Sequence, residues 1–221
     1  MEENEKKKTP EPVVKKKSLL YSIVRVLYLI IAKLFFFMRI DGRENIPADQ
    51  ACILMANHQS VLDPLTLALC CPDRQIYFMG KKELFQKKFF GNILRRVHAF
   101  PVDRGNLDMN AVRTAMSILR SGETLGIFPE GTRSRTGYMG PLLGGASLLA
   151  IKSACPVVPI YIEGRYWIFH PMCVHIGRPI EMADLLAGRI NRETGEVMTG
   201  RMQDAFLHLS GGKCLPPPEK P

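Results

Sequence analysis

A histidine and an aspartate stand close together in the segment Asn57-His58-Gln59-Ser60-Val61-Leu62-Asp63-Pro64. The segment follows an apolar run, residues 52–56, which is typical of a short buried strand. A carboxylate that accepts a hydrogen bond from one imidazole nitrogen fixes the tautomer, and the other nitrogen can then take a proton from a nucleophile. We therefore predict that His58 and Asp63 form a catalytic dyad.

Asp63 also has an ordinary structural explanation. An aspartate followed by a proline often starts a helix, with the aspartate as the N-cap, and residues 64–69 are typical of a short helix. A histidine near an aspartate is, without further context, more often a structural pair than a catalyst. We expect Asp63 to face His58, and Ser60 to cap the helix in its place.

Polar groups also follow two later apolar runs, residues 99–102 and 125–128. Arg104 comes after the first run, and Glu130 and Arg133 come after the second. In an open, mostly parallel sheet the carboxyl ends of the strands share one edge, where ligands bind. Because the arginine guanidinium suits phosphate, the sequence predicts a phosphate-bearing substrate beside the dyad.

The rest of the chain alternates short apolar runs with helical stretches. This pattern predicts an α/β fold with a mixed, largely parallel sheet flanked by helices. Pro159 falls inside one expected strand, so we expect that strand to lie at an edge of the sheet or to end its pairing there. Residues 81–96 are expected to form one basic helix, with six lysines and arginines against one glutamate. Other strands are expected at 75–80, 157–162 and 174–176, and other helices at 108–120, at 145–153 and in the remainder to about residue 209.

The charge balance indicates the kind of partner. The formal net charge is +9, which favours nucleic acid, a phospholipid surface or a phosphorylated substrate. No nucleic-acid-binding motif occurs in the sequence, so we expect a membrane partner and no nucleic acid. The six cysteines lack paired metal-ligand spacing and are expected as reduced core residues of a protein that faces the cytosol.

Two segments of different character precede the domain. Residues 1–17 are polar with two lysine runs, and we predict a disordered tail able to contact anionic lipid heads. Residues 18–38 are apolar and long enough to cross a bilayer, but Arg25 and Lys33 are costly inside one. Because these two cations share a helical stripe with two serines, we expect a helix that lies in the membrane interface with the stripe in water. A membrane span and a first helix packed on the domain are the alternatives.

Four segments, taken in order, resemble the motifs of the glycerolipid acyltransferases, and the PlsC-like lysophosphatidate acyltransferases are the most similar type. These segments are Asn57 to Asp63, Phe100 to Arg104, Phe128 to Ser134 and Val157 to Ile160. The resemblance covers about residues 40–180 of a domain expected at residues 39–210, with a disordered tail at 211–221. It implies transfer of a fatty acyl group from a thioester to the free hydroxyl of lysophosphatidate, which gives phosphatidate for phospholipid synthesis.

The resemblance also implies roles for individual residues. His58 would be the general base and Asp63 its orienting partner, and backbone amides after His58 are candidate donors to the oxyanion. Contacts to the substrates would come from Asn57, Lys81, Arg104, Glu130, Gly131, Thr132, Arg133 and Pro159. The resemblance implies no bound cofactor and no metal, and the acyl donor would be acyl-CoA or acyl-carrier protein. The expected location is the cytoplasmic face of the cell membrane, in contact with its phospholipids.

Two positions depart from the family pattern and bear on the acceptor. His98 stands where glycine is usual, and residues 142–145 read Leu-Leu-Gly-Gly where Phe-Lys-x-Gly is usual. These departures leave two alternative functions open. One is acyl transfer to another lysophospholipid or lyso-lipid, and the other is non-catalytic lipid binding on the same scaffold.

Overall fold

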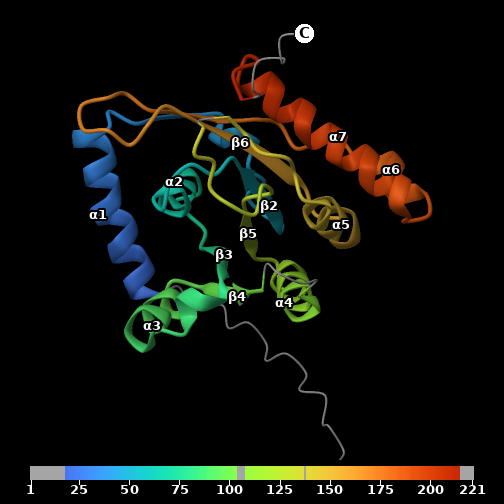
Figure 1. The fold of residues 1–221 in the computed structure, drawn as a ribbon, viewed down its shortest axis with the longest axis horizontal. Helices are drawn as coiled ribbons and strands as arrows, with labels where there is room; N and C mark the ends of the chain where they lie inside the picture. The colour runs from blue at the N-terminus through green and yellow to red at the C-terminus, as the bar shows by residue number, and fades with distance from the viewer. Residues whose placement is uncertain (1–17, 104–107, 137, 215–221) are drawn as a thin grey trace, which may run out of the picture.

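A central sheet with helices on both of its faces forms the molecule (Figure 1). The computed structural model describes residues 18–103, 108–136 and 138–214. The strands are β1 (Arg39–Asp41), β2 (Cys52–Ala56), β3 (Ile76–Lys81), β4 (Ala99–Val102), β5 (Thr124–Ile127), β6 (Val157–Glu163) and β7 (Cys173–Ile176). The longer helices are α1 (Leu19–Phe35), α2 (Asp63–Cys70), α3 (Lys88–Arg96), α4 (Met109–Arg120), α5 (Gly144–Ser153) and α7 (Arg192–Leu209), and α6 (Ala183–Ala187) is a short one.

The strand order is β1-β7-β6-β2-β5-β3-β4. Neighbouring strands run parallel except β6 and β7, which are antiparallel. The predicted α/β fold with a mixed, largely parallel sheet is therefore confirmed. The tail predicted at residues 1–17 lies outside the described residues. Within the stretch assigned to the second tail, Cys214 is buried.

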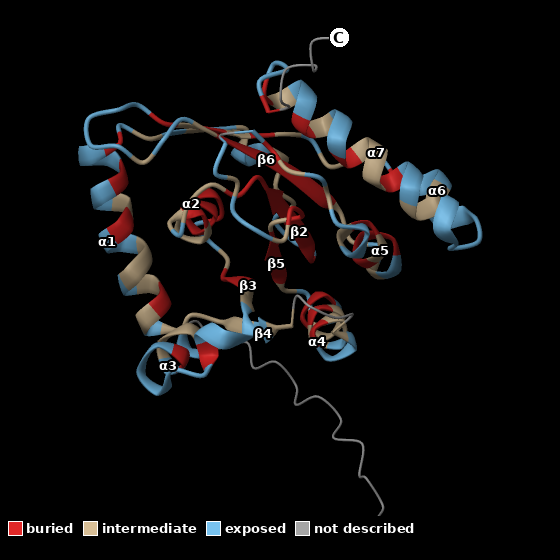
Figure 2. Ribbon diagram, in the orientation of Figure 1, coloured by how far each residue is buried: buried red, intermediate tan, exposed pale blue. Residues whose placement is uncertain are grey.

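The core forms on both faces of β2, whose five residues are all buried. Ile53 and Met55 point to one face and pack in a cluster with side chains of α4, α5 and α7. Leu54 and Ala56 point to the other face and pack with side chains of α1 and α2. Because successive side chains of a strand alternate between faces, one short apolar run serves both layers (Figure 2).

α1 packs against the domain along one face. Its Arg25 side chain donates to the carbonyl of Pro72, and the Ser18 N–H at its N-cap donates to Gln75 Oε1 at 2.9 Å. Arg25 therefore contacts the domain, contrary to the expectation that the polar stripe faces water, whereas Lys33 of the same stripe is exposed.

The outer face of α1 is apolar. Exposed side chains on this face are Leu19, Ile23, Val26, Leu27, Ile30 and Leu34. In Figure 1 the helix stands at the side of the molecule away from α7, so this face is turned away from the sheet. None of the helices in the described part of the chain is long and apolar enough to cross a membrane.

The basic segment 81–96 is not one helix. A 3-10 helix, η2 (Lys82–Phe85), is followed by the separate helix α3. A Cβ atom on Gly91 would lie 2.5 Å from the carbonyl oxygen of Phe85, so the two pieces pack backbone against backbone. The chain folds back at this point, which the spacing of the cations does not indicate.

Pro159 lies in β6, a central strand between β7 and β2, so the first alternative, an edge strand, is wrong, and the second, an end of the strand pairing at the proline, holds on the β7 side. The register with β2 pairs Pro159 with Met55, whereas the pairing with β7 begins only at Ile160. The Pro159 carbonyl accepts from Gly177 N, just past the end of β7. Because the N–H and C=O of one strand residue point the same way, the missing donor of Pro159 also faces the end of β7.

Candidate active site

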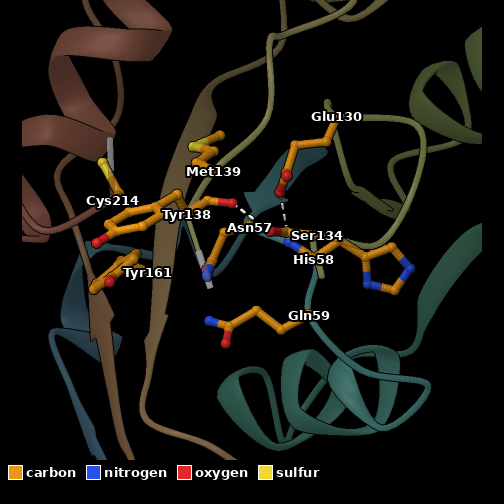
Figure 3. Close-up of a pocket in the computed structure, with 9 residues that line it drawn as sticks. All are labelled: Asn57, His58, Gln59, Glu130, Ser134, Tyr138, Met139, Tyr161 and Cys214. Atoms are coloured by element: carbon orange, nitrogen blue, oxygen red, sulfur yellow. Dashed lines mark hydrogen bonds between the residues drawn. The ribbon is translucent and has the colours of Figure 1, made fainter. Parts of the chain in front are cut away.

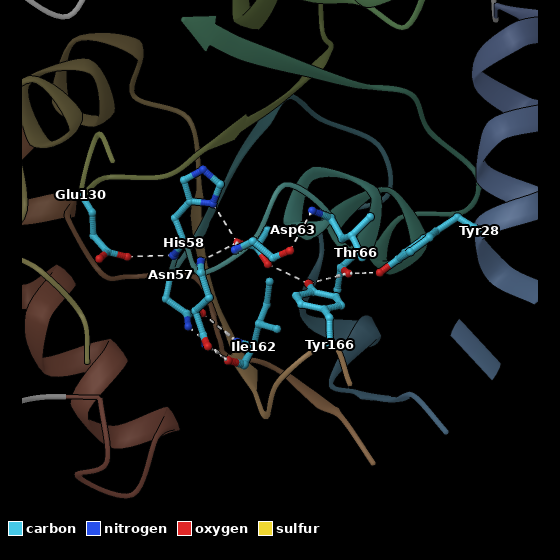
Figure 4. Close-up of polar contacts among 11 residues, drawn as sticks. Tyr28, Asn57, His58, Asp63, Thr66, Glu130, Ile162 and Tyr166 are labelled. Carbon is cyan, nitrogen blue, oxygen red and sulfur yellow. Dashed lines mark hydrogen bonds and ion pairs between the residues drawn. The ribbon is translucent and has the colours of Figure 1, made fainter. Parts of the chain in front are cut away.

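His58 and Asp63 meet at the carboxyl edge of β2, where the chain passes from the strand toward α2 (Figure 4). His58 Nδ1 lies 2.7 Å from Asp63 Oδ2, and the side chains are 11% and 0% exposed. An ionised carboxylate can only accept, so Nδ1 carries the proton and the lone pair is on Nε2. The expected contact is present, and the histidine is in the tautomer that a general base requires.

Asp63 accepts more hydrogen bonds than the one from His58. Its Oδ2 also accepts from Gln59 N at 2.6 Å and from Ser60 N at 2.7 Å, and its Oδ1 accepts from Tyr166 OH at 2.7 Å. Four donors thus fix the carboxylate, which holds the loop before the helix instead of capping the helix.

This geometry corrects two expectations. The N-cap of α2 is Leu62, which makes no side-chain cap bond, and Ser60 Oγ accepts from the N–H of that leucine at 3.2 Å within the turn. Ser60 is therefore not the helix cap. The amides of Gln59 and Ser60 both donate to Asp63, so these two are already used and do not serve as donors to an oxyanion.

Glu130 holds the loop after β5 against the dyad segment. Its Oε1 accepts from His58 N at 2.7 Å, and its Oε2 accepts from Gly140 N at 2.8 Å. Ser134 N donates to the His58 carbonyl at 2.8 Å. Burial raises the pKa of the Glu130 carboxyl, and the two backbone donors act in the opposite direction. Both carboxyl oxygens accept from backbone N–H groups, so Glu130 positions the loop and His58, and its contact with substrate stays a prediction.

Asn57 binds the start of the dyad segment to β6 through its side-chain amide. Its Oδ1 accepts from Ile162 N at 2.7 Å, and its Nδ2 donates to the Ile162 carbonyl at 3.1 Å. Gln59 Nε2 donates to the same carbonyl at 2.8 Å. Asn57 is buried and its side chain joins two strands at the sheet edge, and its contact with a substrate stays a prediction. His58 is therefore held between β5 and β6.

The imidazole of His58 packs under an aromatic ring. Phe128 stacks on it with the ring centroids 4.1 Å apart and the planes 18° from parallel. Figure 3 shows a small hollow lined by Asn57, Glu130 and Tyr138, and the imidazole points away from it. The reactive side of His58 is thus on the opposite side of the segment from this hollow.

The loop after Glu130 carries three further predicted substrate residues. Gly131 has φ +66°, and a Cβ atom there would lie 2.4 Å from Leu143 Cδ1. The positive φ favours glycine, whereas the close contact is with the end of a flexible, exposed leucine side chain. Thr132 and Arg133 are exposed, directly before the serine that bonds the His58 carbonyl. They lie beside the dyad, and their contact with substrate stays a prediction.

The remaining predicted substrate residues are spread over the sheet. Lys81 ends β3, and its exposed side chain forms an ion pair with Glu83 at 3.2 Å. The register pairs Lys81 with Val102, so it lies at the same edge as His58. Arg104 lies outside the described residues. Pro159 is buried within β6, away from the edge.

Comparison with known proteins identifies the family. A family model described as Acyltransferase matches residues 37–163, which is more than half of the chain. The chain belongs to this family. The matched segment contains both residues of the dyad and the whole of the Glu130 loop.

This acyltransferase is similar to two curated relatives named 1-acyl-sn-glycerol-3-phosphate acyltransferase. It is 36% identical to the Bacillus subtilis protein over 152 residues, which are 66% of this chain and 75% of that one. It is 30% identical to the Streptococcus pneumoniae protein over 167 residues, 73% of this chain and 61% of that one. A solved structure of the PlsC 1-acyl-sn-glycerophosphate acyltransferase from Thermotoga maritima superposes with a TM-score of 0.68 at 27% identity. That match covers 90% of this chain and 81% of the other.

Two aromatic residues of this acyltransferase site were not predicted as site residues. Phe128 stood in a recognised segment, but its sequence gives no sign that the ring stacks on His58. Tyr166 lies in the loop between β6 and β7, far from Asp63 in the sequence, and follows no motif. Only the three-dimensional structure brings it to the dyad.

Proposed function

We propose that this acyltransferase transfers a fatty acyl group from an acyl thioester to the free hydroxyl of lysophosphatidate, giving phosphatidate for phospholipid synthesis. The observation that carries the proposal is the buried pair of His58 Nδ1 and Asp63 Oδ2, 2.7 Å apart at the carboxyl edge of the sheet. The names of the relatives, which specify 1-acyl-sn-glycerol-3-phosphate as the substrate, support the acceptor.

The reaction follows from the tautomer of His58. Nε2 accepts the proton of the lysophosphatidate hydroxyl as the hydroxyl oxygen attacks the thioester carbonyl. The tetrahedral intermediate collapses, the carbon–sulfur bond breaks, and the thiolate takes the proton back from Nε2. Asp63 stabilises the imidazolium between these steps and stays ionised. Proton transfer to a positioned base contributes about 10² to 10⁴-fold to such reactions.

Cations at the same edge suit the anionic groups of both substrates. Arg133 beside the dyad and Lys81 at the end of β3 are exposed. We assign the phosphate of the acceptor to the arginines Arg104 and Arg133, because a guanidinium can form two parallel bonds to phosphate. The acyl donor is acyl-CoA or acyl-carrier protein, and both of these carriers are anionic.

An assay with purified protein tests this function. We expect phosphatidate and free thiol from lysophosphatidate with at least one of the two donors, acyl-CoA or acyl-carrier protein. Lysophosphatidylcholine and lysophosphatidylethanolamine, assayed under the same conditions, should give a lower kcat/KM because the phosphate monoester is masked. Absence of turnover with both donors would contradict the proposal.

Leu143 supports a second class of acceptor, another lysophospholipid. Leu143 packs beside Gly131 in the wall of the loop, where its side chain is apolar and exposed. This favours an acceptor with less charge near that wall, such as another lysophospholipid. His98 gives no such support. It lies at the amino ends of the strands, just before β4, whereas the dyad lies at their carboxyl ends. Its φ is +64°, and its ring packs against Tyr77. Equal kcat/KM for all the lyso-acceptors in the assay would favour this second class.

We further propose that the protein works at the cytoplasmic face of the cell membrane, with α1 lying in the interface. The apolar outer face of α1 is continued by a loop with exposed Trp167, Ile168 and Phe169. The Phe169 N–H donates to the carbonyl of Phe35, so the loop and the end of α1 form one surface. An apolar face of this kind, with basic residues elsewhere on the chain, suits an anionic lipid surface.

The double variant Ile23→Glu/Ile30→Glu tests this location. Both side chains are about half exposed on the outer face of α1, so the charges should leave the fold intact. We expect binding to neutral phosphatidylcholine vesicles to fall about tenfold or more in a sedimentation assay, because two apolar side chains no longer enter the lipid. Neutral vesicles are used because they do not attract the lysine runs of residues 1–17, so the assay measures apolar contacts alone.

The matched control carries the same charges on α7, as Val197→Glu/Leu207→Glu. These side chains are exposed to a similar degree, on the other side of the sheet. This variant should bind vesicles as the wild type does. Equal binding by the α1 variant and the wild type would mean that α1 is not the membrane contact.

A further inference from the structure

A chain of three hydroxyl groups leads from α1 to the dyad (Figure 4). Tyr28 OH on α1 lies 2.8 Å from Thr66 Oγ1 on α2. Thr66 Oγ1 lies 2.9 Å from Tyr166 OH, and Tyr166 OH lies 2.7 Å from Asp63 Oδ1. The three hydroxyls therefore form one continuous path of hydrogen bonds that ends on the carboxylate oxygen not used by His58.

The carboxylate determines the direction of every bond in this chain. Asp63 is an acceptor, so the single hydroxyl proton of Tyr166 is donated to it. The Tyr166 oxygen can then only accept from Thr66, whose own proton is used in that bond. Tyr28 must therefore donate to Thr66. Hydrogen bonds that all point the same way polarise one another, which strengthens the last one, onto Asp63.

Burial keeps the two phenols protonated and able to donate. Desolvation raises the pKa of Tyr28 to about 12. Desolvation also raises the pKa of Tyr166, and the negative charge of Asp63 raises it further. Thr66 and Asp63 are both fully buried. The chain is thus shielded from water at the end that meets the dyad.

We propose that Tyr166 is a positioning residue of the reaction: its hydroxyl, oriented by Thr66 and Tyr28, fixes the Asp63 carboxylate so that Oδ2 stays on His58 Nδ1. The inference rests on the proposed acyl transfer. Oδ2 already accepts from His58 and from the amides of Gln59 and Ser60. Oδ1 has Tyr166 as its donor. Without that donor the buried Oδ1 lacks a partner, and the carboxylate turns toward other donors or water.

A purely structural role is the competing explanation. Tyr166 lies in the loop that carries Trp167 and Phe169, and its ring packs edge-on against Phe36 with centroids 5.7 Å apart. In that case its hydroxyl would only tie the loop to the core. Tyr166→Phe separates the two roles, because phenylalanine keeps the ring contact and removes the hydroxyl alone.

The test is a series of variants along the chain. We expect Tyr166→Phe to lower kcat roughly tenfold with little change in KM, since the lost bond is to a charged group behind the base. Thr66→Val should give a smaller loss of kcat, and Tyr28→Phe a smaller one again. Thr66→Ser keeps the hydroxyl and should restore kcat.

Tyr21→Phe is the matched control. Tyr21 is also a buried tyrosine of α1, but its hydroxyl accepts from Ile76 N at the start of β3. This variant loses a buried hydroxyl outside the chain and should keep the wild-type kcat. Melting temperatures of all five variants show how far each one is destabilised.

A second measurement does not depend on turnover. The Nδ1–H proton of His58 gives an NMR resonance that reports its bond to Asp63. The resonance should move in Tyr166→Phe and stay in place in Tyr21→Phe. An unchanged resonance in Tyr166→Phe, together with wild-type kcat and a lowered melting temperature, would overturn the positioning role. If the wild-type protein showed no turnover but the resonance still moved in Tyr166→Phe, the proposed acyl transfer alone would be contradicted.

Discussion

Replacing His58 with alanine should lower kcat for acyl transfer by about 10² to 10⁴-fold, because the proposed acceptor of the hydroxyl proton is removed. The side chain is almost fully buried between Phe128 and Asp63, but the segment does not depend on it for its position. Its backbone is held by Glu130 at the N–H and by Ser134 at the carbonyl, and alanine keeps both bonds. The measurement is kcat and KM with lysophosphatidate and an acyl thioester.

His98→Ala is the matched control for this variant. His98 is a half-buried histidine at the amino end of β4, far from the carboxyl ends of the strands where the dyad lies. The centroids of its ring and the Tyr77 ring are 4.9 Å apart. Burial lowers the pKa of its imidazole, which therefore stays neutral near pH 7. We expect wild-type kcat for His98→Ala at a temperature where it is folded. If His58→Ala also kept the wild-type kcat, the dyad would not be the catalytic base.

The strands and the dyad followed from local patterns. The apolar run 52–56 and the alternation of short apolar segments with helical ones are typical of a parallel sheet. The helix expected at 108–120 is present as α4, and Asp108 is its N-cap, accepting from Asn110 N and Ala111 N. A sheet edge that collects the carboxyl ends of strands then brings His58 and the Glu130 loop together without further information.

The roles of polar side chains at that edge depended on partners distant in sequence. Glu130 and Asn57 were predicted to hold substrate, and the structure shows a role for each that was not predicted, in hydrogen bonds to backbone groups of a neighbouring segment. A polar residue at a strand end has the same residue type in either role. Which role it takes depends on the backbone donors that the neighbouring strand presents, and the sequence does not specify those contacts.

Direction is the other property that a one-dimensional pattern lacks. The helical stripe that contains Arg25 was recognised, but periodicity does not say which face meets the domain. Tyr28 and Tyr166 show the same limit, since no spacing links α1 to the loop after β6. Both tyrosines nevertheless reach Asp63 through Thr66.

Asp63→Asn should be as damaging to catalysis as His58→Ala and should also destabilise the fold. The carboxylate accepts from four donors, whereas an amide has one acceptor oxygen with two lone pairs. At least one buried donor is then left without a partner, at a cost of about 1 to 3 kcal/mol. Urea unfolding measures this loss, with the exposed Asp73→Asn as the control that should leave both stability and kcat unchanged.

Both orientations of the amide in Asp63→Asn impair the base, because the carboxylate charge that stabilises the imidazolium is lost. If Nδ2 faces His58, the imidazole must change tautomer to accept from it, and the proton then sits on Nε2, where the lysophosphatidate hydroxyl has to react. We expect kcat to fall about 10³ to 10⁴-fold, as for loss of the orienting carboxylate in a catalytic triad.

If instead the amide oxygen faces the amides of Gln59 and Ser60, Nδ2 faces Tyr166. The hydroxyl of Tyr166 must then turn round and donate to Thr66, which reverses the whole chain. In both orientations Tyr166 no longer has a carboxylate to position. Tyr166→Phe added to Asp63→Asn should therefore lower kcat little further, although it lowers kcat roughly tenfold in the wild-type background. Full additivity of the two losses in this double-mutant cycle would show that Tyr166 acts independently of Asp63.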